Sequence, residues 1–292
     1  MRDYIELTKP RITWLILMST GIGYFFGLPQ VPGWLAFLKS IHVVSLLHTI
    51  FGTGLIASGT AALNMWYERE ADGQMRRTAQ RPLPAGRITA GGALAFGVAL
   101  SLFGFAELAL EVNLLSGLIG LFTLTSYLFL YTPMKQRTWW STTIGAIPGA
   151  MPPMIGYAAA AGRITFEAWV LFAILFLWQF PHFYSIAWMY REDYARAGIR
   201  MLPVVEPDGR STARQIVLFG IALIPVSLIP AMLGMSGPVY VTGALLLGLW
   251  FLYSGLRVAF DRTILRARKV LMTSVFYLPL IYGLMLIDRP GL

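Results

Sequence analysis

A polar stretch between two long apolar runs carries three oxygen-bearing side chains at regular spacing. Asn64, Glu68 and Asp72 stand at every fourth residue. On an α-helix a step of four residues turns the chain by only about 40°, so the three side chains line one face. Carboxylate and amide oxygens gathered on one face favour a hard divalent cation such as Mg²⁺.

Basic side chains follow this face directly. Arg76, Arg77 and Arg81 come next, before Pro82 and Pro84 end any helix. Arginine binds phosphate oxygens bidentately, so acids beside arginines predict a metal–diphosphate site. The alternative is a solvated loop with the positive charge that is common on the cytoplasmic side of membrane proteins. The regular Asn/Glu/Asp spacing favours the site.

Composition decides which elements position these residues. The 292-residue chain is 57% hydrophobic and 13% charged, whereas soluble domains carry about 25% charged residues. Apolar runs of about 20 residues recur, as membrane-spanning helices require. The net charge of +9 lies between these runs, which indicates membrane topology rather than nucleic-acid binding. The absence of cysteine excludes thiolate catalysis and Cys-ligated zinc.

The pattern predicts an all-α integral membrane protein in which about nine transmembrane helices form one bundle and one domain, residues 1–292. The expected spans are 12–28, 41–63, 89–106, 114–131, 141–161, 168–188, 215–234, 238–257 and 270–287. With the N-terminus cytoplasmic and the C-terminus outside, every Lys and Arg lies inside except Lys39, Arg163 and Arg289. The start of the chain has neither a signal-peptide nor a transit-peptide pattern, which favours the cytoplasmic membrane of a bacterium or archaeon.

Two polar segments, near 64–88 and 189–214, then face the cytoplasm four spans apart, which suggests a weak repeat with a shared site. In the second segment, Glu192 and Asp193 could hold a further Mg²⁺ or could pair with Arg191 and Arg196. Both interpretations stay open.

Other side chains have a functional and a structural interpretation. Lys135 and Arg137 could reach the diphosphate or serve topology alone, and Tyr131 could bind the phosphate or lie at the interface. His182 could carry a proton or contact a bound cofactor, or it could bond a carbonyl freed by Pro181.

The fifth span contains three prolines, which remove backbone donors, so it is expected to line a cavity, with a kink used only for helix packing as the open alternative. They are Pro148, Pro152 and Pro153. We expect a structural role for His42, and the role of His48 stays open.

Several motifs follow one another from the second to the seventh span. They are Asn64-xxx-Glu68-xxx-Asp72, Tyr131-Thr-Pro-Met-Lys-Gln-Arg137, Trp178-Gln-x-Pro-His-Phe183 and Glu192-Asp-Tyr-xx-Ala-Gly-Ile199. Together they resemble the membrane prenyltransferase superfamily of the 4-hydroxybenzoate polyprenyltransferase type. Within it the chain is most similar to the branch that transfers farnesyl from farnesyl diphosphate to a vinyl group of haem B and adds water, which gives haem O.

The resemblance implies a role for each group of residues. Catalytic roles are implied for Asn64, Glu68, Asp72 and Asp193. Mg²⁺ would be bound by Asn64, Glu68, Asp72, Glu192 and Asp193. The diphosphate would be bound by Arg76, Arg77, Arg81, Tyr131, Lys135 and Arg137. Haem would contact Trp178, His182, Phe183, Tyr190 and Tyr194. The implied partners are the two substrates, the lipid bilayer and a downstream haem A synthase, with no nucleic acid.

One departure bears on the acceptor. Phenol-prenylating members of the superfamily usually carry a second Asp-xxx-Asp, and the matching positions here are Tyr190 and Tyr194. This argues against the first alternative, a prenyltransferase for a phenolic quinone precursor or a chlorophyll-type acceptor. The second alternative, a nine-span transporter, is disfavoured because the charges lie in loops on one side rather than at the bilayer midplane.

Overall fold

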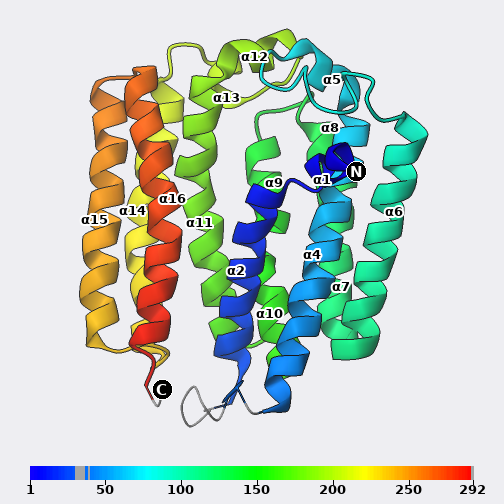
Figure 1. Ribbon diagram of the computed structural model, residues 1–292. Helices are drawn as coiled ribbons and strands as arrows, with labels where there is room; N and C mark the ends of the chain where they lie inside the picture. The colour runs from blue at the N-terminus through cyan, green and yellow to red at the C-terminus, as the bar shows by residue number, and fades with distance from the viewer. Residues whose placement is uncertain (30–36, 39, 291–292) are drawn as a thin grey trace.

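The computed structural model describes residues 1–29, 37–38 and 40–290, and its long helices run side by side in one bundle (Figure 1). The long helices are α2 (Pro10–Gly27), α4 (Ile41–Tyr67), α6 (Ala90–Ala106), α7 (Leu114–Thr125), α11 (Phe166–Met189), α14 (Arg210–Met232), α15 (Pro238–Phe260) and α16 (Ile264–Ile287). The short ones are α1 (Arg2–Leu7), α5 (Arg69–Gln74), α8 (Thr132–Met134), α9 (Ser141–Gly149), α10 (Pro152–Ala161), α12 (Arg191–Arg196) and α13 (Leu202–Val205). Two π-helical segments, η1 (Glu107–Val112) and η2 (Ser126–Tyr131), adjoin α7.

Within the described ranges, seven helical segments are long and apolar enough to cross a membrane. The predicted multi-pass, all-helical membrane protein is therefore confirmed. The two other expected spans, 12–28 and 141–161, correspond to α2 and to the broken pair α9–α10. The total of nine spans stays a prediction, and Lys39 lies outside the described residues.

The two ends of the bundle differ. The N-terminus, α5, α8, α12 and α13 gather at one end, which we call the polar end, and the C-terminus lies at the other (Figure 1). Both polar segments found in the sequence are therefore at the same end of the molecule. They come from opposite halves of the chain, so only the packed bundle can bring them together.

Glycines let two helix pairs approach closely enough to fix the walls below the polar end. A Cβ on Gly23 of α2 would lie 1.9 Å from the carbonyl oxygen of Pro153, and one on Gly156 of α10 would lie 1.8 Å from that of Thr20. The backbones of α2 and α10 are therefore in direct contact. Gly59 likewise lets α4 pack closely against α6, because a Cβ on Gly59 would lie 2.8 Å from the Gly97 carbonyl oxygen. Small residues at such crossings are typical of membrane helices.

The suspected repeat has a clear structural form. α4 ends at Tyr67 and α5 begins at Arg69, with Glu68 between them at φ −89° and ψ 8°. α11 ends at Met189 and α12 begins at Arg191, with Tyr190 between them at φ −114° and ψ 21°. Each long helix thus breaks at one residue and continues as a six-residue helix at the polar end.

Candidate active site

The predicted face of Asn64, Glu68 and Asp72 survives the break between α4 and α5. The backbone N–H of Glu68 donates to the Asn64 carbonyl at 2.9 Å, and that of Asp72 donates to the Glu68 carbonyl at 2.8 Å. Helical hydrogen bonding therefore continues across the break and keeps the three side chains in line. Asn64 and Asp72 are almost fully buried, with 2% and 1% of their surface exposed, so they face the protein interior rather than solvent.

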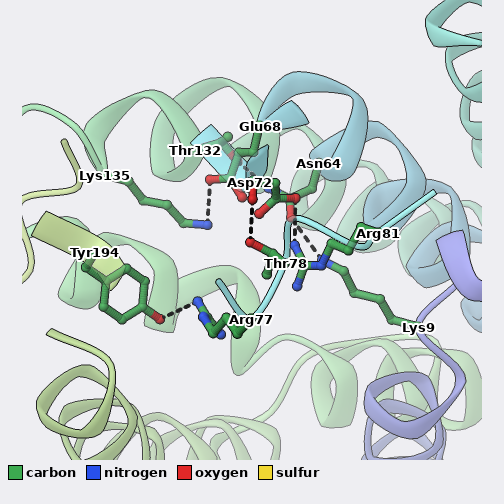
Figure 2. Close-up of polar contacts among 10 residues, drawn as sticks. All are labelled: Lys9, Asn64, Glu68, Asp72, Arg77, Thr78, Arg81, Thr132, Lys135 and Tyr194. Carbon is green, nitrogen blue, oxygen red and sulfur yellow. Dashed lines mark hydrogen bonds and ion pairs between the residues drawn. The ribbon is translucent and has the colours of Figure 1, made fainter. Parts of the chain in front are cut away.

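Glu68 forms an ion pair with Lys135, which follows α8 (Figure 2). The Lys135 Nζ lies 2.7 Å from Glu68 Oε1, and both side chains are largely buried. Burial opposes the charged forms of both groups, but their mutual attraction outweighs it. The pKa of Lys135 is therefore raised well above its usual value, and the pKa of Glu68 is lowered. The pair stays charged at neutral pH.

Asp72 is held from the loop that follows α5. Arg81 Nη1 lies 2.7 Å from Asp72 Oδ2, and the Thr78 hydroxyl donates to the Asp72 carbonyl at 2.8 Å. The second carboxylate oxygen, Oδ1, is buried and has no hydrogen-bond partner. Buried carboxylate oxygens are rarely left without a partner, so Oδ1 indicates a place for a ligand.

Lys9 also lines the site, although the sequence did not single it out. Its charge was interpreted only as one of the basic residues on the cytoplasmic side. Its Nζ donates to Asn64 Oδ1 at 3.0 Å. Burial first, and then the nearby charges of Arg81 and Lys135, lower the Lys9 pKa to about 7. Among the described residues it is the one non-glycine with positive φ, at 48°, a conformation that costs about 1 kcal/mol or more. The only sequence signal was its position directly before Pro10 and the first span.

These groups surround a cavity that encloses about 470 Å³ of space between its walls, its open mouth included. Arg77 reaches it from the loop after α5 and donates from Nη2 to the Tyr194 hydroxyl at 2.9 Å. The Arg77 guanidinium also lies 5.1 Å from the Tyr190 ring centre and 4.9 Å from that of Tyr194. Both aromatic rings therefore hold one arginine at the cavity wall. The complete lining is Lys9, Asn64, Glu68, Asp72, Met75, Arg77, Arg81, Tyr127, Tyr131, Lys135, Tyr194, Ile199 and Met201.

Tyr131, predicted as a phosphate contact, lines this cavity from η2 together with Tyr127. The Lys135 Nζ lies 4.5 Å from the Tyr131 ring centre. A π-helical turn at a ligand cavity is a common arrangement in proteins. The two tyrosines form the part of the cavity wall beside the Glu68–Lys135 pair.

Four predicted ligands lie elsewhere. Arg76 and Arg137 are exposed and do not line the cavity. Glu192 is exposed, and Asp193 is buried in an ion pair with Arg196. Of the two interpretations of these acids, the structure contains the pairing of Asp193 with Arg196. Metal binding by Glu192 or Asp193 stays a prediction.

The proposed haem contacts on α11 lie against α16. Trp178 Nε1 donates to the Ser274 carbonyl at 2.8 Å, and His182 Nδ1 lies 2.8 Å from the Ser274 hydroxyl. The His182 ring stacks on Trp178 at 4.8 Å and meets the edge of Phe183 at 5.5 Å. This bond to Ser274 is neither of the contacts considered from the sequence. None of the three lines the polar cavity.

A second, apolar pocket lies below the polar cavity, and we call it the tail pocket. It encloses about 720 Å³, its open mouth included, and shares Lys9 and Tyr127 with the polar cavity. Its walls come from α2, α4, the α7–η2 segment and the α9–α10 break, where Pro148 and Pro152 line it. The expectation that the fifth span lines a cavity is confirmed for these two prolines. The complete lining is Lys9, Ile12, Thr13, Ile16, Thr53, Ile56, Ala57, Thr60, Ala61, Thr123, Tyr127, Pro148, Gly149, Pro152 and Ile155.

Comparison with known proteins assigns the chain to a family. The model of the UbiA prenyltransferase family matches residues 16–278. The chain belongs to the UbiA prenyltransferase family. A relative from Solibacter usitatus (strain Ellin6076), named protoheme IX farnesyltransferase, is 80% identical over 292 residues, which is 100% of both chains. One of the same name from Koribacter versatilis (strain Ellin345) is 46% identical over 99% of this chain and 94% of its own.

Solved structures share the UbiA fold at low identity. A digeranylgeranylglyceryl phosphate synthase has a TM-score of 0.76 at 18% identity, covering 100% of this chain and 99% of its own. A UbiA homolog from Archaeoglobus fulgidus, bound to GPP and Mg²⁺, has a TM-score of 0.64 at 15% identity, covering 97% of this chain and 99% of its own. These likenesses establish the shared helical architecture.

Membership of the UbiA family raises the question whether this cavity fits Mg²⁺. Within the described ranges no three His, Cys, Asp or Glu side chains form a metal-holding group. Mg²⁺, however, usually binds through one or two carboxylates together with substrate phosphates and waters. The free Asp72 Oδ1, the Glu68 carboxylate and the Asn64 amide supply hard oxygens of that kind. The residues therefore fit one Mg²⁺ that is completed by the substrate.

Proposed function

We propose that this chain transfers the farnesyl group of farnesyl diphosphate to a vinyl group of haem B, with addition of water, to give haem O. The observation that carries the proposal is a charged cavity that shares a wall with an apolar tail pocket. A prenyl diphosphate has the same two parts. The full-length relative from Solibacter usitatus, 80% identical and named protoheme IX farnesyltransferase, supports haem B as the acceptor.

The cations of the polar cavity stabilise the leaving diphosphate. Lys9, Arg77, Arg81 and Lys135 bring four basic side chains to the lining of the cavity. Preorganised charge aimed at a developing anion is among the largest contributions that a protein makes to catalysis. As the C1–oxygen bond of the substrate breaks, negative charge collects on the diphosphate, where these groups lie. Predicted diphosphate contacts from the exposed Arg76 and Arg137 remain part of the proposal for the substrate-bound state.

Binding requires an exchange of ion-pair partners. Lys135 and Arg81 now hold the carboxylates of Glu68 and Asp72. A diphosphate attracts both cations, which frees carboxylate oxygens for Mg²⁺. When bound by Asn64, Glu68 and Asp72, Mg²⁺ supplies further positive charge to the leaving group. Before substrate enters, these pairs neutralise two of the four basic side chains of the cavity.

The tail pocket shields the allylic cation from water. Its walls below Lys9 are apolar side chains and threonines, which exclude solvent from the farnesyl carbons. The vinyl group attacks C1 of the allylic cation, and water then adds to the new cation on the acceptor and loses a proton. Trp178, His182, Phe183, Tyr190 and Tyr194 are the proposed haem contacts, and Tyr190 and Tyr194 also hold Arg77.

We further propose nine spans, with the polar end and the N-terminus cytoplasmic and the C-terminus outside, in a bacterial or archaeal cytoplasmic membrane. The basic residues support this orientation, because Arg163 and Arg289 are the only described ones at the other end. A haem A synthase that takes the product is the proposed partner in that membrane.

The test is transfer by the purified protein in lipid nanodiscs with haem B, farnesyl diphosphate and Mg²⁺. We expect a product with the mass of haem B plus a farnesyl group and a hydroxyl group. Prenylation of 4-hydroxybenzoate without any farnesylated haem would overturn the proposal in favour of the phenolic alternative. A sample with EDTA in place of Mg²⁺ tests the metal separately.

A further inference from the structure

Four helices contribute lining residues to the tail pocket, and they reach different depths. α4 and α7 run toward the polar end, and α2 and α9–α10 run away from it (Figure 1). The deepest lining residue of each is therefore the lowest-numbered one on α4 and α7 and the highest-numbered one on α2 and α10. These residues are Ile16, Thr53, Thr123 and Ile155. Thr53 and Ile155 reach farthest from the polar cavity and form the floor, because Gly120, before Thr123, lies beside Ile56, and Gly156, after Ile155, lies beside Thr20.

Close helix packing lies next to both floor residues. Gly156, which follows Ile155, is the position where α10 touches the Thr20 carbonyl of α2. On the other side, a Cβ on Gly52, which precedes Thr53, would lie 2.9 Å from the Leu108 side chain. The contact between α2 and α10 joins backbone to backbone and cannot yield as a flexible side chain can. The floor is therefore fixed most firmly on the Ile155 side.

The distance from the polar cavity to the floor of the tail pocket matches the length of a particular prenyl chain. Asn64 and Thr53 lie eleven residues apart on α4, which is ~16 Å along the helix axis and about the extended length of three isoprene units. We propose that Thr53 and Ile155 set the length of the transferred prenyl chain by ending the pocket after the third unit. This inference rests on the proposed function and assigns the residues that select its donor.

Thr53 is the better position for a test. It is 1% exposed, and its hydroxyl has no hydrogen-bond partner, so replacing it breaks no bond in the structure. Thr60 lies seven residues further along the same helix, also lines the pocket, and donates to the Ile56 carbonyl at 2.8 Å. It lies about two turns nearer the polar end and is a matched control for a wall rather than a floor position.

The experiment compares geranyl, farnesyl and geranylgeranyl diphosphate as donors to haem B, with kcat/KM for each. Thr53→Ala deepens the floor and should raise the geranylgeranyl-to-farnesyl ratio about tenfold, the usual effect of a small change in an apolar pocket. Thr53→Leu raises the floor and should raise the geranyl-to-farnesyl ratio by a similar factor. Ile155→Val removes one methyl from the opposite side and should shift preference toward the longer chain by a smaller factor.

Two controls separate depth from other causes. Thr53→Val keeps the volume and removes the hydroxyl, so the ratios should not change. Thr60→Ala should weaken all three donors alike and leave the ratios unchanged. Unchanged ratios in both Thr53→Ala and Thr53→Leu, or an equal shift in Thr60→Ala, would overturn the proposal.

Binding distinguishes this proposal from the function on which it rests. The affinity of each diphosphate for the protein can be measured by calorimetry in nanodiscs without haem. If wild-type protein transfers no prenyl group to haem B, the proposed function fails. Tighter binding of geranylgeranyl diphosphate by Thr53→Ala and of geranyl diphosphate by Thr53→Leu, each relative to farnesyl diphosphate, would still support the floor. The absence of both shifts would overturn the inference about the floor.

Discussion

The two broken helices at the polar end share a backbone pattern and differ in chemistry. After α4 the break residue and the residue four further on are Glu68 and Asp72, and after α11 they are Tyr190 and Tyr194. The acid pair holds Lys135 and Arg81, whereas the tyrosine pair holds Arg77. The same local geometry thus supplies carboxylates on one side of the cavity and an aromatic clamp for a cation on the other.

The comparison also explains why Glu192 and Asp193 do not face the cavity. They lie two and three residues after the break at Tyr190, where the first segment has Glu70 and Ala71. Glu70 is exposed, like Glu192. Residues two apart on a helix point in very different directions, because each residue turns the chain by about 100°. The position of each acid relative to the break in the helix, and not acidity alone, therefore decides which acids line the cavity.

The largest effect should come from the acid pair. Asp72→Asn removes the negative charge that Arg81 neutralises and replaces one of the two carboxylate oxygens with an NH2 group, so haem O formation should fall about a thousandfold at unchanged expression. Asp193→Asn is the matched variant from the second segment and should cost far less, because Asp193 pairs with Arg196 outside the cavity. Mass spectrometry of the product measures both. Equal losses of haem O formation in the two variants would show that the two polar segments contribute equally to catalysis.

Lys135→Met should have the next largest effect. It leaves Glu68 buried without its partner and removes a diphosphate contact, so we expect about a hundredfold loss of kcat/KM and a lower melting temperature. Arg137→Met, two residues away and exposed, is the control. If both variants behave alike, general positive charge rather than the Glu68–Lys135 pair is responsible.

The Lys9 pKa of about 7 predicts a pH dependence. Below pH 7 the ammonium form predominates, and above pH 7 the neutral amine does. A bound diphosphate favours the ammonium form, so affinity should fall up to about tenfold per pH unit as pH rises above 7. Lys9→Arg stays charged and should bind with little pH dependence in this range. Identical pH profiles for the two proteins would remove Lys9 from the binding step.

The smallest effect should come from the tyrosine clamp. Tyr194→Phe keeps the ring beside Arg77 and removes the hydroxyl that accepts its hydrogen bond, so KM for farnesyl diphosphate should rise about threefold to tenfold. Glu192→Gln changes an exposed neighbour and should leave KM unchanged. A Tyr194→Phe enzyme with wild-type KM would show that ring stacking alone holds Arg77.

Some features of the protein follow from the sequence alone. The four-residue spacing of Asn64, Glu68 and Asp72 guarantees one helical face, because the backbone fixes the helical period. The long apolar runs predict membrane helices, because each run is about as long as a bilayer is thick. Lys135 and Tyr131 could also be named, because their motif joins a span to a loop at the same end.

Tertiary structure decided the rest. Lys9 reaches Asn64 across 55 residues of chain, and Tyr194 meets Arg77 across 117. Such distances depend on how the helices pack, which no local pattern records. The pairing of Asp193 with Arg196 and the position of His182 against Ser274 depended on which face each helix turns toward its neighbours. Glycines at positions 23 and 156 let α2 and α10 touch beside Ile155, the residue that lines the tail pocket there.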